Sequence, residues 1–295
     1  MGFFKSLFGG GADEAPTEEE KKNAEERNFD LLKYDGVKAM RIRQYDYAVK
    51  CFREALKVHD DLEIRDYLAQ SLVQTGDLQA AIAELQQLLD AQPDNVSIYQ
   101  QMAHIAFMDE DYAQVNDICQ RGLAVDGGNA RLHYTLAQAS AAQHDYVTAV
   151  AQLTQTIALD GEMGDARLLR GQTLLAMGDT ESALADADWL MEHVADHEDV
   201  LLLKARVEHA RGNNDEAIRL YDAVNEANPF QLDAFRERGR IRLEQGDKAG
   251  AEEEMKKLLE LNPDELAGVS GDYKAEGVEE MMKRTQSSFI NPLGL

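Results

Sequence analysis

The histidines are the first candidates for chemistry, because imidazole groups bind metal ions. His193 and His197 are four residues apart, which would place both rings on one helix face, and the stretch EHVADHED surrounds them with carboxylates. Two imidazoles and a carboxylate are a ligand set for zinc. However, this stretch falls where a helix should end, and it contains no cysteine. We therefore expect no functional metal site and no other cofactor.

Other catalytic arrangements are missing from the sequence. It contains no glycine-rich phosphate loop, nucleophile elbow or CxxC pair. Asp186 and Asp188 are two residues apart, so on a helix their carboxylates face different directions. Cys51 and Cys119 are the only cysteines, and both lie among aliphatic residues, where a free cysteine behaves as a small buried hydrophobe. The sequence therefore predicts a protein that is not an enzyme.

The charge of the chain limits its partners. The 55 Asp and Glu residues outnumber the 30 Lys and Arg residues, so the net charge is −25. Such a surface repels phosphate backbones, which argues against nucleic acid as a partner. The acidic residues either keep a long scaffold soluble or form a site for a basic partner. No apolar run approaches the roughly 20 residues of a membrane-spanning helix, and we expect a cytoplasmic protein.

A repeat of 34 residues runs through most of the chain. Small residues recur at one interval of 33 and five of 34 residues: Ala48, Ala81, Val115, Ala149, Ala183, Ala217 and Ala251. Gly or Ala also stands twelve residues before each of them. Helices approach closely only where side chains lack bulk, so each repeat is predicted to be an antiparallel helix pair.

The turn inside each repeat carries the residues that end one helix and begin the next. Four repeats have glycine followed by Asp or Asn there: Gly76-Asp77, Gly178-Asp179, Gly212-Asn213 and Gly246-Asp247. Glycine adopts the left-handed conformation that ends a helix, and Asp or Asn caps the next one. Helix pairs of this kind cannot bury both faces alone, so they must stack on one another.

These residues closely resemble the tetratricopeptide repeat family. The period, the small residues at the eighth and twentieth positions, the aromatic residues Tyr45, Tyr112 and Tyr146, and the closing Pro93, Pro229 and Pro263 match its pattern. The resemblance covers about Phe29 to Pro263. It implies an all-α, right-handed superhelical solenoid of seven antiparallel helix pairs, whose first helices line a concave groove. It also implies a non-enzymatic scaffold or adaptor that binds a peptide segment of a partner protein in that groove.

The family's register implies which side chains line the groove. In the first repeats these are Asp30, Lys33, Val37, Met40, Glu63, Asp66, Gln70 and Val73. The middle repeats supply amides and aromatic rings suited to an extended backbone: Gln100, His104, Phe107, Tyr134 and Gln138. The last repeats supply Gln172, Arg206, His209, Arg236 and Arg240. The three arginines would bind an acidic group of the partner; the alternative is that the arginines here pair with Asp233, Glu237 and Glu244.

The chain divides into three segments: 1–28, an amphipathic amino terminus with an acidic linker and lead-in helix; 29–263, the repeats; and 264–295, a capping helix and apolar tail. Phe3, Phe4, Leu7 and Phe8 have the spacing of one helix face. They are candidate membrane-contact residues, or they dock on the solenoid. The alternative function is therefore a membrane-surface tether or assembly factor, at the inner face of the membrane.

Overall fold

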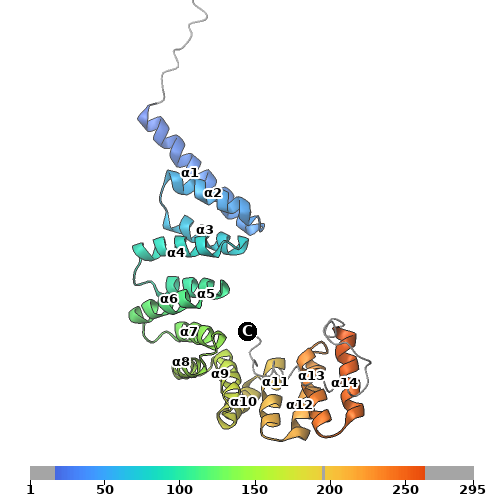
Figure 1. The fold of residues 1–295 in the computed structure, drawn as a ribbon. Coiled ribbons are helices and arrows are strands. Elements are labelled where there is room, and N and C mark those ends of the chain that lie inside the picture. Colours follow the sequence, from blue (N-terminus) through green and yellow to red (C-terminus); the bar gives the residue numbers. More distant parts are fainter. Residues whose placement is uncertain (1–16, 195–196, 263–295) are drawn as a thin grey trace, which may run out of the picture. The chain divides into compact units, whose positions relative to one another are not determined.

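The computed structural model describes residues 17–194 and 197–262 (Figure 1). These residues form 14 α-helices and no strand. The candidate membrane-contact residues Phe3, Phe4, Leu7 and Phe8, and the predicted capping helix and apolar tail, lie outside the described residues. None of the described helices combines the length and the apolar character needed to cross a membrane.

The helices form two compact units, one ending at Asp111 and the other beginning at Tyr112. The helices of the first unit are α1 (Glu18–Arg41), α2 (Tyr45–Val58), α3 (Leu62–Thr75), α4 (Leu78–Ala91) and α5 (Val96–Met108). Those of the second unit are α6 (Tyr112–Val125), α7 (Ala130–Ala142), α8 (Tyr146–Leu159), α9 (Gly164–Ala176), α10 (Thr180–His193), α11 (Glu198–Ala210), α12 (Asn214–Ala227), α13 (Leu232–Glu244) and α14 (Lys248–Leu261). Within each unit, helices that follow one another in sequence pack together.

The small residues of the repeat lie where the helices cross. All seven central small residues, from Ala48 to Ala251, have no exposed surface. A Cβ on Gly36 would lie 2.8 Å from Phe52 Cδ1, and one on Gly171 would lie 2.8 Å from Leu203 Cδ2. Both distances are too short for carbon atoms, so only glycine allows these helices to approach. The predicted all-α solenoid of helix pairs is confirmed.

The turns inside the repeats share one conformation. Gly76, Gly178 and Gly212 have φ of 82° and Gly246 has φ of 85°, as predicted for glycines that end a helix. Where glycine is missing, Arg43, Glu110 and His144 adopt φ of 57–60°. The next residue caps the following helix in only some repeats. Asp145, Asp179 and Asp247 accept a backbone hydrogen bond, whereas Asp77 and Asn213 make no such side-chain bond.

The lead-in helix and the first repeat form one continuous helix. α1 is 24 residues long and begins at Glu18, well before the expected start of the repeats at Phe29. The other helices have 13 or 14 residues, which matches the predicted period. The first repeat therefore presents a first helix that extends beyond its partner.

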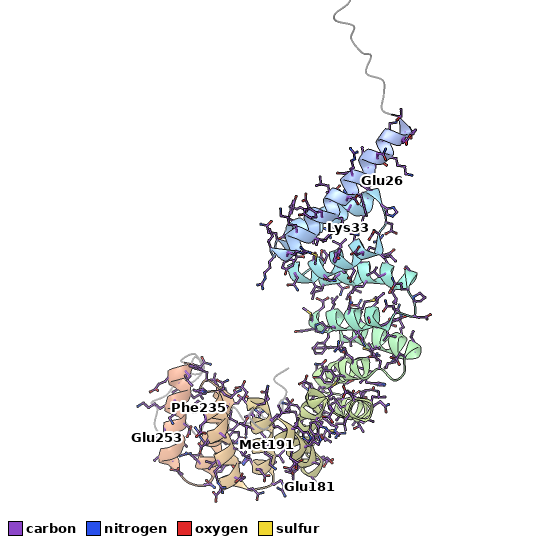
Figure 2. The ribbon with its side chains drawn as sticks, turned by 180° about the vertical axis from the view of Figure 1, so that it is seen from behind. Glu26, Lys33, Glu181, Met191, Phe235 and Glu253 are labelled. Carbon is purple, nitrogen blue, oxygen red and sulfur yellow. The ribbon has the colours of Figure 1, made fainter. Side chains whose placement is uncertain are left out.

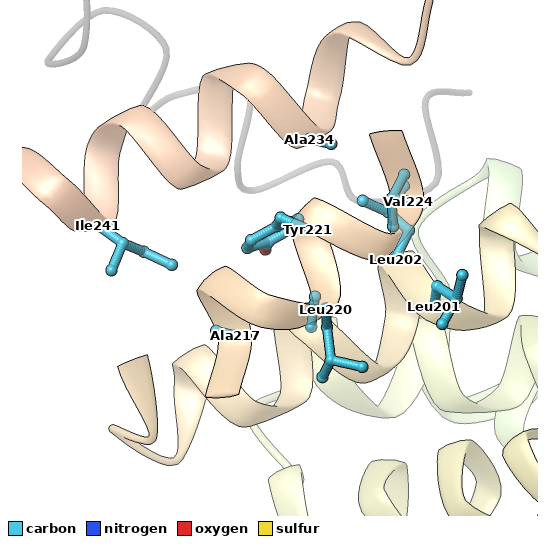
Figure 3. Packing of buried hydrophobic residues seen from close by; sticks show 9 residues of the cluster. Leu201, Leu202, Ala217, Leu220, Tyr221, Val224, Ala234 and Ile241 are labelled. Carbon is cyan, nitrogen blue, oxygen red and sulfur yellow. The ribbon is translucent and has the colours of Figure 1, made fainter. Parts of the chain in front are cut away.

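The core of the second unit holds α11, α12 and α13 together (Figure 3). The cluster contains Leu201, Leu202, Ala205, Ala217, Leu220, Tyr221, Val224, Ala234 and Ile241. Tyr221 is the largest of these and is fully buried. Because its ring lies between three helices, its hydroxyl is carried into the interior, where it needs a hydrogen-bond partner.

Candidate functional site

The first unit contains a pocket of about 420 Å³ on the side formed by its first helices. The first helices α1, α3 and α5 contribute Met40, Gln70, Val73, Gln74, Gln101 and His104. We call this pocket the first-unit groove. Three consecutive repeats therefore contribute to one surface, as expected for the concave side of a helix-pair stack.

Three polar side chains of the first-unit groove have no partner among the described residues. Gln74, Gln101 and His104 are exposed and make no hydrogen bond or ion pair there. Gln70 differs, because its Nε2 donates to Asp66 Oδ2 at 2.8 Å. Amides and imidazole both donate and accept hydrogen bonds. The groove thus presents unused donors and acceptors beside apolar side chains.

The predicted groove residues of α5 occupy this region in part. His104 lines the first-unit groove. Gln100 and Phe107 lie about one turn to either side of His104 on α5 and are partly buried. The family register missed Gln74 and Gln101, because each stands one residue after a position that the register assigns to the groove. A slightly wider face on each first helix would have included both.

Arg206, predicted to bind a partner, is buried in the second unit. It is 8% exposed. Its Nε donates to Glu237 Oε1 at 2.9 Å, and its Nη2 donates to the same oxygen at 2.7 Å and to Asp233 Oδ2 at 3.1 Å. Burial lowers the pKa of Arg206, but the Glu237 carboxylate outweighs burial and raises that pKa above its ordinary value. These contacts join α11 to α13.

Tyr221 completes this network from α12. Its hydroxyl donates to Glu237 Oε2 at 2.5 Å. Burial, reinforced by the charge of Glu237, raises the pKa of Tyr221 well above its ordinary value, so the hydroxyl keeps its proton. One buried carboxylate therefore links three helices.

The remaining basic candidates also have acidic neighbours. Arg236 Nη1 donates to Asp233, and Arg240 Nε lies 3.6 Å from Glu244 Oε1. His209 is hydrogen-bonded to Asn214, with 2.9 Å between Nδ1 and Oδ1. These pairs are the ones that the alternative interpretation of the sequence named. The structure thus assigns the arginines to contacts within the second unit, and whether any of them also meets a ligand stays a prediction.

The other predicted groove residues of the second unit are partly buried. Tyr134 packs against the cluster of Ala137, Leu153 and Ala166. Burial, with a smaller effect of the charge of Asp165, raises the pKa of Tyr134 to about 12. Gln138 and Gln172 are also partly buried. Their contact with a partner stays a prediction.

The histidine pair is not assembled into a metal site. His193 Nδ1 donates to the carbonyl oxygen of Trp189 at 2.7 Å, and its ring stacks on the indole with 3.9 Å between centroids. His197 Nδ1 lies 3.6 Å from Asp199 Oδ2. The described residues include no group of three or more His, Cys, Asp or Glu that could hold a metal ion.

The paired carboxylates of α10 face different partners, as predicted. Asp186 is buried and accepts two hydrogen bonds from Arg170, at 2.8 Å from Nε and 2.7 Å from Nη2. Asp188 accepts a hydrogen bond from Lys204 Nζ at 2.6 Å. Each carboxylate therefore joins α10 to a neighbouring helix.

Comparison with known proteins places this geometry in context. The family model of the tetratricopeptide repeat matches residues 36–96, 134–188 and 202–265, together more than half of the chain. A tetratricopeptide repeat protein from Parabacteroides merdae is 15% identical, with a TM-score of 0.64, covering 88% of this chain and 99% of its own. No curated protein matches the sequence significantly.

Two further solved structures are similar. PilF from Pseudomonas aeruginosa is 16% identical, with a TM-score of 0.59, covering 77% of this chain and 97% of its own. YrrB, described as a tetratricopeptide repeat protein with an unusual peptide-binding site, is 18% identical, with a TM-score of 0.53, covering 61% of this chain and 93% of its own. At these identities the similarity shows the fold.

Proposed function

The chain belongs to the tetratricopeptide repeat family, and we propose that its first-unit groove binds an extended segment of a partner protein. Repeats of this family form scaffolds for protein–protein interaction and are generally non-enzymatic. The observation that carries the proposal is the set of exposed, unpaired side chains in the groove: Gln74, Gln101 and His104.

The groove has the chemistry that an extended peptide requires. A peptide backbone in this conformation presents carbonyl and N–H groups that its own chain does not satisfy. Gln74 and Gln101 can donate to the former and accept from the latter. Met40, Val73 and Ile105 line the same pocket and can accept apolar side chains of the segment. Polar groups would set the register, and apolar contacts would add binding free energy.

The second unit supports this choice of site by contrast. Its arginines donate to Asp233 and Glu237, so a ligand would have to compete with buried carboxylates for them. The amides of the first-unit groove face no such competition. We therefore assign the primary binding role to α3 and α5.

Selection from a random twelve-residue peptide library on the full-length chain tests the proposal. The double variant Gln74→Ala/Gln101→Ala removes two groove amides. The control Gln87→Ala/Gln155→Ala removes two exposed amides from the second helices α4 and α8. Selected peptides should bind the control like the original chain and the groove variant about ten-fold more weakly, because each lost hydrogen bond costs about 1 kcal/mol. Equal binding to both variants, or failure to select any peptide, would refute the proposal.

A second candidate function rests on the spacing of Phe3, Phe4, Leu7 and Phe8 along one helix face. In this function, the amino terminus tethers the scaffold to the inner face of a membrane. Sedimentation with vesicles of phosphatidylethanolamine and phosphatidylglycerol tests it. Binding that disappears when residues 1–10 are removed would support the tether, and binding that persists, or is absent from the intact chain, would exclude it.

A further inference from the structure

We propose that the segment bound in the first-unit groove carries a lysine or arginine that forms an ion pair with Asp66. This inference rests on the proposed function, because it names the chemistry of the ligand at the same site. It commits to a basic segment rather than an acidic one. The contacts of Asp66, the charges of the surrounding helices and the commitments of the nearby cations support it.

Asp66 lies on α3 about one turn before Gln70, which lines the groove. Its Oδ2 accepts a hydrogen bond from Gln70 Nε2 at 2.8 Å, and no other side chain of the described residues bonds to it. An ionised carboxylate has about four acceptor positions. Asp66 is only partly exposed, so water cannot reach the carboxylate from every side. A cation in the groove would satisfy both the charge and the remaining acceptor positions.

The cations of the first unit that lie on neighbouring first helices are already paired. Lys33 on α1 (Figure 2) donates to Glu63 Oε2 at 2.5 Å and lies 3.9 Å from Asp61 Oδ2. Arg65 on α3 forms ion pairs of 2.7 Å with Asp60 and with Glu84. Each of these two cations therefore contacts two carboxylates other than Asp66.

The sequence of the groove helices leaves this negative charge uncompensated. From Asp60 to Asp111, which spans α3, α4 and α5, there are eleven Asp and Glu residues and one basic residue, Arg65. A field of this sign attracts a basic segment and repels an acidic one. The groove side chains Gln74, Gln101 and His104 contribute no fixed positive charge that would offset it.

Burial has a cost that a basic ligand would reverse. Burial raises the pKa of Asp66, and the like charge of Glu63 adds to the increase, whereas the hydrogen bond from Gln70 acts against it. Because this pKa is raised in the folded state, the ionised form of Asp66 lowers stability, and the loss appears as pH rises through the raised pKa. A lysine or arginine would instead favour the ionised form. The free energy spent on burying the carboxylate would then be recovered on binding.

The variant Asp66→Asn tests the inference on the full-length chain. It removes the charge but keeps the size and an oxygen that can accept from Gln70. Asp90→Asn is a matched control, because Asp90 also accepts a hydrogen bond from a glutamine four residues away, Gln86 Nε2 at 2.8 Å, but lies exposed on α4. Both variants change the net charge equally. Because Asp66→Asn removes a partly buried charge, it should melt no lower than the original chain.

The probes are peptides selected from the random twelve-residue library. Lysine or arginine should be enriched at one position of the peptides whose binding depends on Gln74 and Gln101. Asp66→Asn should weaken the binding of a synthetic copy about ten-fold, and Asp90→Asn should change it less than about two-fold. When methionine replaces the cation of the peptide, the effect of Asp66→Asn should disappear.

The outcomes separate this inference from the proposed function. Groove-dependent peptides that lack a basic residue, that are acidic, or that respond equally to Asp66→Asn and Asp90→Asn would overturn the role of Asp66 and leave the groove as a binding site. Peptide binding that does not respond to Gln74→Ala/Gln101→Ala, or no selected peptide at all, would overturn both.

Discussion

Replacing Arg206 by alanine should destabilise the second unit far more than removing an exposed arginine. Arg206 is 8% exposed, and Glu237 is 6% exposed. The variant leaves the Glu237 carboxylate buried, with the Tyr221 hydroxyl as its remaining donor among the described side chains. Leaving one charge of a buried ion pair without its partner costs about 3–5 kcal/mol. For a unit of this size, such a loss lowers the melting temperature by about 6–20 °C.

A double-mutant cycle separates the cost of the unpaired charge from the value of the pair. Arg206→Met/Glu237→Leu replaces both groups by apolar side chains and leaves no buried charge between them. This double variant should recover most of the stability lost in Arg206→Met, because apolar replacement of a buried ion pair is often neutral or stabilising. Tyr221 then loses its acceptor, so the recovery should be incomplete by about 1–3 kcal/mol.

Urea unfolding followed by circular dichroism measures these differences, and hydrogen exchange locates them in α11 to α13. Arg219→Ala is the control, because Arg219 is 72% exposed in its side chain and pairs only with Glu216, at 2.8 Å; an exposed pair of this kind is worth about 0.5 kcal/mol. If Arg206→Ala and Arg219→Ala unfold at the same urea concentration, the buried network does not hold the helices together. The same data decide whether glutamate substitutions at Arg206, Arg236 and Arg240 can be used to study recognition, since a variant that unfolds loses every partner.

Two further predictions concern close packing and thiol chemistry. Gly36→Ala should destabilise the first unit by about 1–3 kcal/mol because its Cβ would overlap the buried ring of Phe52; Gly164→Ala, whose Cβ would make an ordinary 3.7 Å contact, should be neutral or stabilising in the same thermal melt. Burial raises the pKa of Cys119 to about 12, so Ellman's reagent at pH 8 should modify this thiol only when the chain unfolds; rapid labelling of Cys119 in the folded chain would contradict its burial.

The fold followed from the sequence because the repeat sets steric conditions that few other folds satisfy. A period of 34 residues with a small side chain at each helix crossing requires helix pairs of constant length. The structure has no exposed surface at any of the central small residues, such as Ala81 and Ala183. The glycine turns were equally predictable, since φ near 82° at Gly76 or Gly178 strains any other residue. The missing caps at Asp77 and Asn213 were not, because capping depends on local backbone angles.

The site was harder to predict because a register gives the face of a side chain but not its partner. Arg206 was placed on the first-helix face without the knowledge that Glu237 lies opposite it. Residues 30 or 31 apart meet across successive repeats, as in Arg206 with Glu237 and Lys33 with Glu63. Residues 16 apart meet across adjacent helices. Comparing charges at these separations would have indicated which of the arginines are paired within the fold.

The same separations give Asp66 a meaning that its sequence neighbours do not. In the second unit, Asp233 and Glu237 on α13 find their cation 27 and 31 residues earlier, at Arg206. The residues 30 and 31 positions from Asp66 in either direction are Asp35, Gly36, Val96 and Ser97, and none of them is basic. The fold thus balances a first-helix carboxylate where that carboxylate joins helices, and it supplies no such partner from the neighbouring repeats to Asp66 beside the first-unit groove. A charge that the scaffold leaves unbalanced at a binding surface is the charge that a ligand can balance, which is why we expect the cation to come from the partner.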